Sequence, residues 1–65
     1  MILPHQQRVL DEKKELDEKR VKLFHFFQTK AFTDLDLGEQ DRLRAQYGAM
    51  TLYADILNMR ISAWA

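Results

Sequence analysis

The C-terminal part of the chain, residues 37 to 64, carries two rows of apolar side chains on opposite sides of one predicted helix. A helix turns by about 100° per residue. On that spacing the first row comprises Leu43, Tyr47, Met50, Ala54, Leu57, Ile61 and Trp64. The second row comprises Ala45, Ala49, Leu52, Ile56, Met59 and Ala63. A helix with two apolar faces has to be covered from both sides, and the rest of the chain can cover only one. The second row therefore predicts an oligomer interface, and we expect a homo-oligomer.

The composition also favours a partner subunit. Domains of about 65 residues usually need a disulfide, a metal ion or a partner to be stable, and this chain has no cysteine and no cluster of metal ligands. Ten basic and ten acidic residues give a formal charge of zero. This balance argues against extended nucleic acid bound through a broad basic surface, but it allows a small anion in a local pocket.

The apolar runs of the sequence are only a few residues long. They are too short to span a bilayer, and the N-terminal residues do not form the apolar core of a signal peptide. We therefore expect a cytoplasmic protein that does not contact membranes.

The N-terminal part of the chain predicts a first helix over residues 4 to 29. Pro4 suits the first helical position, where a missing N–H costs nothing. Apolar residues repeat every seven positions in a narrow seam: Ile2, Val9, Leu16 and Leu23. In the middle of the helix the flanking seam positions are Lys13 and Arg20. Most charges of this helix are expected to form solvated ion pairs. The alternative is that Lys13, Lys19 or Arg20 faces an anionic ligand or an acidic partner.

Residues 33 to 36 are expected to connect the two helices. Asp36 and Glu39 have the spacing of a capping box at the start of the second helix, residues 37 to 64. Aromatic residues near the connection predict a small end core: Phe24, Phe26, Phe27 and Phe32. Gly48, inside the second helix, would permit the close approach of a neighbouring backbone. Matched helices with a short link give an all-α antiparallel two-helix hairpin, a single domain over residues 1 to 65, which oligomerises into a helical bundle.

No arrangement of residues predicts catalysis. The chain has no Ser/His/Asp set, no Gly-rich phosphate loop and no cysteine nucleophile. We therefore expect no enzyme activity, no cofactor and no metal. One flank of the second helix carries Arg42, Gln46, Tyr53 and Arg60. Arginine pairs with phosphate, tyrosine stacks on a base and glutamine reads a base edge. These residues could bind a nucleotide, and they also fit the polar rim of a protein interface.

The sequence resembles a family of short phage and prophage proteins first noticed in crAss-like phages. The resemblance lies in residues spread over both helices: His5, Gln6, Gln7, Arg8, Val9, Glu12, Lys13, Glu15, Leu16, Glu18, Lys19, Lys22, Leu23, Phe32, Leu35, Glu39, Leu43, Gln46, Met50, Tyr53, Ile56, Leu57, Arg60 and Ile61. That family is similar to the helical-hairpin domain of the phage anti-CBASS and anti-Thoeris sponges, which oligomerise and sequester cyclic oligonucleotide signals of bacterial immunity.

This resemblance implies a phage-encoded trap for cyclic di- or trinucleotides in an infected bacterial host, with pockets where protomers meet and no catalysis. It implies ligand roles for Gln46, Tyr53 and Arg60, with Arg8 and Lys13 as further candidates on the first helix. Phosphates would be held by Arg60, Arg42 or Arg8, and Tyr53 would stack on a base.

Residues 35 to 40 also resemble the interhelical turn of Rop, a plasmid RNA-binding hairpin that dimerises into a four-helix bundle. The helix face that contacts RNA in Rop falls here on mostly apolar residues: Val9, Leu16, Arg20, Phe24 and Ala31. The resemblance therefore favours the Rop architecture more than its RNA activity. Two alternatives to the sponge stay open: a module whose second row docks a host or phage protein, and Rop-like RNA binding.

Overall fold

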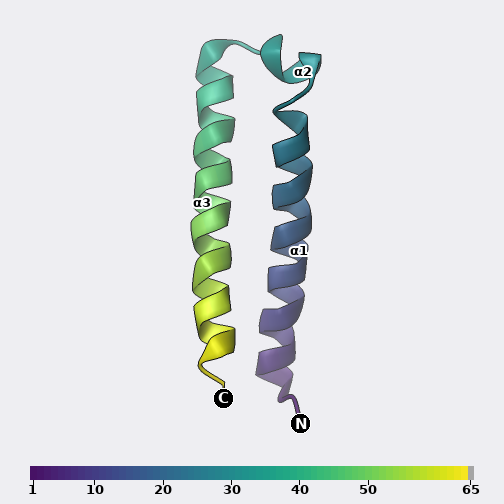
Figure 1. Ribbon diagram of the computed structural model, residues 1–65, viewed down its shortest axis with the longest axis vertical. Helices are drawn as coiled ribbons and strands as arrows, with labels where there is room; N and C mark the ends of the chain where they lie inside the picture. The colour runs from purple at the N-terminus through teal and green to yellow at the C-terminus, as the bar shows by residue number, and fades with distance from the viewer. Residues whose placement is uncertain (65) are drawn as a thin grey trace.

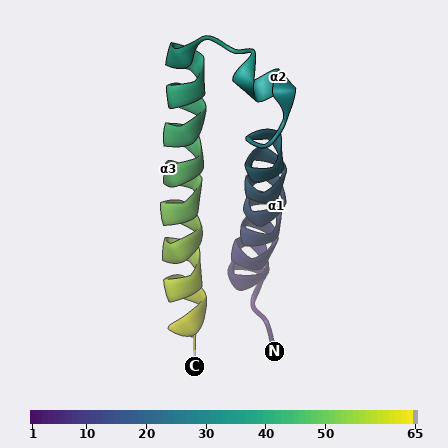
Figure 2. The ribbon, with the colours of Figure 1, turned by 45° about the horizontal axis from the view of Figure 1, so that its top comes forward.

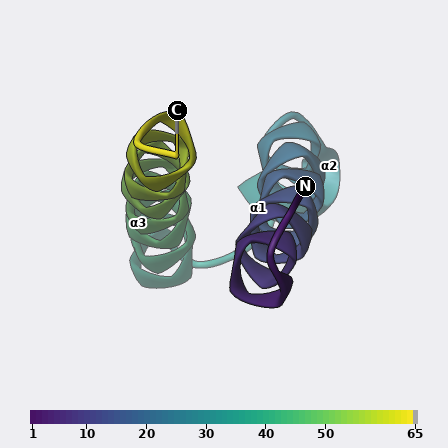
Figure 3. The same cartoon turned by 90° about the horizontal axis from the view of Figure 1, so that it is seen from below.

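The computed structural model describes residues 1–64 as an antiparallel hairpin of two long helices, with a short helix in the connection between them (Figure 1). The helices are α1 (Pro4–Phe26), α2 (Lys30–Thr33) and α3 (Leu37–Ser62). The Cα atoms span 48 × 14 × 14 Å. Figures 2 and 3 show α1 and α3 as two adjacent columns, with α2 at the closed end. Residues 1–64 contain no strand, so the all-helical class is confirmed. Within them, no helix is long and apolar enough to cross a membrane.

The start of α3 is fixed by the predicted N-cap, although only half of the capping box forms. The backbone N–H of Glu39 donates to Asp36 Oδ2 at 3.2 Å. The Glu39 carboxylate does not reach back to the backbone of Asp36, because it accepts a hydrogen bond from Arg42 Nε at 2.9 Å instead. A charge-assisted bond of this kind is stronger than a bond to a neutral N–H.

α1 begins at Pro4 as expected, but it ends at Phe26, three residues before the predicted end. The hydroxyl of Thr29 donates to the carbonyl oxygen of Phe26 at 2.7 Å, and it accepts from the N–H of Phe32 at 3.3 Å. Thr29 has an extended backbone and is the N-cap of α2. Threonine hydroxyls compete with the helical backbone in this way. The connection therefore runs from residue 27 to residue 36 and includes α2.

The first apolar row of α3 faces α1 and forms the centre of the core. Leu57 and Ala54 are 0% and 1% exposed, and Val9 of α1 is 6% exposed. The other members of the row, Trp64 among them, are half-buried. This row and the seam of α1 bury each other, and the short connection makes the two helices antiparallel.

Three of the four aromatic residues predicted for the end core pack together at the closed end of the hairpin, whereas Phe24 is 47% exposed and contacts Tyr47 instead. Phe32 of α2 is 3% exposed. Its ring centroid lies 5.0 Å from that of Phe27 and 5.9 Å from that of Phe26, both edge to face. The guanidinium of Arg44 lies 5.1 Å from the centroid of the Phe32 ring, a distance at which a cation is attracted to an aromatic face. α2 therefore closes the hairpin with a small core of its own.

Gln40 ties the connection to α3 and was not expected to be buried. Its Nε2 donates to the carbonyl oxygens of Leu35, at 2.9 Å, and Thr33, at 3.3 Å. These bonds satisfy the buried amide, which would otherwise destabilise the fold. The side chain thus fixes the loop before α3.

The second apolar row of α3 faces away from α1. Its six residues are all exposed, with Leu52 and Met59 each 63% exposed and Ile56 41% exposed. The view along the helices shows no other helix on that side of α3 (Figure 3). The single chain therefore leaves one apolar face of its longest helix uncovered.

Candidate functional site

The four α3 residues predicted to bind a ligand form one exposed row. Arg42, Gln46, Tyr53 and Arg60 are spaced by four, seven and seven residues, which places them on one face of the helix. Tyr53 and Arg60 each follow a member of the second apolar row by one residue, or about 100° around the helix. This arginine–tyrosine row (Arg42, Gln46, Tyr53 and Arg60) therefore borders the uncovered apolar face.

Within residues 1–64, Arg42 is the member of the row with an ion pair. Its Nε lies 2.9 Å from Glu39 Oε1, and this hydrogen bond raises the pKa of the Arg42 guanidinium further above its usual value. The side chain therefore stays charged, although Glu39 offsets part of that charge. Both side chains are solvent-accessible, so a phosphate could compete with Glu39 at little cost.

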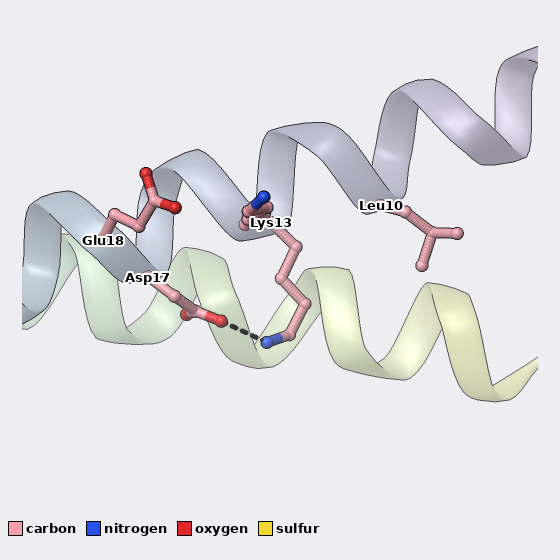
Figure 4. A pocket seen from close by; sticks show the side chains of 5 residues that line it. Leu10, Lys13, Asp17 and Glu18 are labelled. Carbon is pink, nitrogen blue, oxygen red and sulfur yellow. Dashed lines mark hydrogen bonds and ion pairs between the residues drawn. The ribbon is translucent and has the colours of Figure 1, made fainter.

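The two candidates on α1 lie in different surroundings. Arg8 is exposed. Lys13 is half-buried, and its ammonium donates to Asp17 on the same helix, while Glu18 points away from them (Figure 4). Lys13 also lines a hollow of about 350 Å³ with Leu10, Lys14, Asp17 and Glu18. The structure thus groups the four α3 residues on one face and places Lys13 in a hollow that none of them lines.

A second hollow, of about 200 Å³, lies between α1 and α3 and was not predicted. It is lined by Arg20, Val21, Phe24 and Tyr47. The Phe24 and Tyr47 rings are inclined at 36°, with centroids 6.1 Å apart. Phe24 is 47% exposed and Val21 is 51% exposed. The sequence did contain one signal for this place, because Arg20, like Lys13, is a charged residue at a flanking position of the seam of the first helix.

Two cations share one carboxylate beside this hollow. Asp17 accepts hydrogen bonds from Lys13 Nζ and from Arg20 Nη2, the latter at 3.3 Å. The hydrogen bond from Lys13 is the main cause of a lowered pKa for Asp17, with charge attraction from both cations adding to it and partial burial opposing it. Asp17 is therefore ionised near neutral pH. The three groups carry two positive charges and one negative charge, so their net charge is +1.

Together these features describe a small helical hairpin that presents apolar, aromatic and cationic surfaces suited to binding. The chain belongs to the Sequestin family, whose sequence profile matches residues 3–63. The match covers both long helices and the whole connection between them. No curated protein and no solved structure matches the chain.

Proposed function

We propose that this protein sequesters cyclic oligonucleotide signals as a homo-oligomer and does not turn them over. The family name Sequestin denotes sequestration and supports binding rather than catalysis. The resemblance to phage sponges supports cyclic di- or trinucleotides of bacterial immunity as the ligands. On this proposal the protein is a phage anti-defence protein.

The observation that carries the proposal is the uncovered apolar face of α3 with the arginine–tyrosine row along its edge. Full burial of an exposed Leu, Ile or Met side chain is worth roughly 1.5–3 kcal/mol, and Leu52, Ile56 and Met59 are 63%, 41% and 63% exposed, so burying each one would contribute about half of that. A second copy supplies an equivalent face, and most homo-oligomers join equivalent surfaces in this way. Such packing brings the arginine–tyrosine rows to the rim of the interface, where pockets between protomers form.

The chemistry of the row fits a nucleotide. Arg60 and Arg42 hold phosphate oxygens through paired N–H donors. Tyr53, which is exposed, stacks on a base, a contact worth about 1–3 kcal/mol. Gln46 reads a base edge, and Arg8 and Lys13 add positive charge from α1. Because none of these residues is placed as a nucleophile or a general base, the ligand is held intact.

The assembly is tested first. Light scattering coupled to size-exclusion chromatography is expected to show an oligomer for the wild type and a smaller species for Leu52→Glu/Ile56→Glu, since charges on the apolar face oppose its burial. The matched control is Leu37→Glu, at an exposed position outside the second row. A monomeric wild type, or an unchanged double variant, would contradict the proposed interface.

Ligand binding is tested by calorimetry and thermal shift with a panel of cyclic di- and trinucleotides. A ligand at ten times its Kd stabilises the fold by about 1.4 kcal/mol, enough to raise the Tm of so small a domain by several degrees. Tyr53→Ala and Arg60→Ala should weaken binding, whereas Asn58→Ala, on the other flank of α3, should not. Chromatography after incubation should return the ligand intact.

Three results would count against these assignments. Binding of no cyclic nucleotide would refute the ligand class, and hydrolysis of the ligand would refute sequestration. Unchanged affinity in both the Tyr53→Ala and Arg60→Ala variants would refute the arginine–tyrosine row as the site while leaving the ligand class intact.

A further inference from the structure

We propose that the hollow lined by Arg20, Val21, Phe24 and Tyr47 is a second ligand site, formed within one protomer, that takes the base and a phosphate of a nucleotide. The choice of a nucleotide rests on the proposed function. The site itself rests on the ring geometry, the exposed apolar side chains and the charge around Arg20.

This hollow lies on the other side of α3 from the arginine–tyrosine row. Arg20 and Phe24 contact Thr51 and Tyr47 of α3, respectively. Thr51 is two residues from Tyr53, or about 200° around the helix. The uncovered second row points away from α1, so an oligomer that buries this row leaves the hollow open. The two sites can therefore be occupied independently.

The apolar side of the hollow suits one planar ring. Phe24 and Val21 are about half exposed, so each presents apolar surface to a ligand in the hollow. The Phe24 and Tyr47 rings are inclined to each other and form two walls of a hollow of about 200 Å³. Pockets for whole drug-sized ligands are larger, about 300–1,000 Å³. The space therefore fits a single heteroaromatic base stacked on these rings better than it fits a complete cyclic dinucleotide.

The polar side of the hollow suits an anion. Arg20 donates to Asp17 at 3.3 Å and to Thr51 at 3.5 Å, both longer than the usual 2.9–3.0 Å. Its Nε is buried and has no hydrogen-bond partner among the described residues. Asp17, the carboxylate that faces Arg20, is shared with Lys13, so the group keeps a net charge of +1. A phosphate would replace weak hydrogen bonds with strong paired ones.

The experiment follows ligand binding to the full-length oligomer by calorimetry, and follows the ring protons of Phe24 and Tyr47 by NMR. The ligands are the cyclic di- and trinucleotide panel and, separately, AMP and GMP. The variants are Phe24→Ala, Arg20→Gln and Val21→Trp, with Tyr53→Ala as the control on the other flank. Circular dichroism checks folding. Val21→Trp fills the hollow from an exposed position, so it tests the site even if Phe24→Ala does not fold.

We expect calorimetry of the wild type to resolve two binding events with cyclic nucleotides, and each of the three variants to weaken one of them at least roughly tenfold while leaving the other intact. In the Tyr53→Ala control, the ligand should still shift the Phe24 and Tyr47 ring signals. Unchanged affinity in all three variants, with a wild type that binds, would overturn this site and leave the proposed function standing. A second outcome is that the wild type binds no cyclic nucleotide, but AMP or GMP shifts its Phe24 and Tyr47 ring signals and does not shift them in Val21→Trp. This outcome would overturn the proposed function and support the site. A wild type that responds to neither set of ligands would overturn both.

Discussion

Replacing Gly48 with alanine should stabilise the protein. Gly48 lies inside α3 with an ordinary helical backbone, and a Cβ built there meets no atom within 4 Å among the described residues. Alanine therefore adds no clash and no strain, and it removes the conformational freedom that glycine loses in a helix. The expected gain is about 0.8–1.0 kcal/mol per chain, which raises the Tm of a domain of this size by about 4–8 °C.

The measurement is thermal unfolding followed by circular dichroism, at several protein concentrations, with Gly38→Ala as the matched control. Gly38 is also helical, but a Cβ there lies 3.1 Å from Asp36 Oδ2. That oxygen caps α3 through the N–H of Glu39. The Asp36 side chain must shift to make room, so Gly38→Ala should give a smaller gain than Gly48→Ala, or a loss.

A lower Tm for Gly48→Ala, or a change in oligomer size, would refute this reasoning. Gly48 lies one helical turn before Leu52, beside the second apolar row. Either result would mean that the backbone of another subunit approaches Gly48 closely, as the sequence first suggested. Such a contact is not present among residues 1–64 of the single chain.

Further predictions concern the core, the helix cap and acid stability. Leu57→Ala should lower the free energy of unfolding, measured in urea, by about 2–5 kcal/mol because Leu57 is fully buried. Leu37→Ala, on the surface, should change it by less than about 0.5 kcal/mol. Equal effects would contradict the assigned core face. Asp36→Ala should cost about 1 kcal/mol through loss of the cap, and an unchanged Tm would show that this bond contributes nothing. The pKa of Asp17 is lower in the folded state than in the unfolded chain. The stabilisation that ionised Asp17 gives the fold is therefore complete above its unfolded pKa of about 3.9, and it is lost as the pH falls through its folded-state pKa. The wild type should therefore lose more stability than Asp17→Asn between about pH 5 and pH 2, and parallel acid titrations would contradict the ion pair.

The candidate sites differ in how far the sequence could predict them. Helical spacing alone places the four residues of the arginine–tyrosine row on one face, and in the structure all four are exposed. The hollow beside Arg20 could not be derived in this way. Its walls come from residues 20 to 24 and residue 47, and they meet only because of the register between two helices that are distant in sequence.

The sequence by itself determined the features that depend on near neighbours. Pro4 and Asp36 begin the two long helices, and the period of the apolar residues makes two opposite rows on α3. Each of these needs only a few residues along one helix.

Only the tertiary structure decided which of the two rows α1 covers. It also decided that Thr29 ends α1 early and that Gln40 is buried against the connection. Both rows have the same period, so the spacing along one helix cannot distinguish them. The choice depends on how the side chains of α1 and α3 fit together, and that fit leaves Leu52, Ile56 and Met59 exposed for a partner.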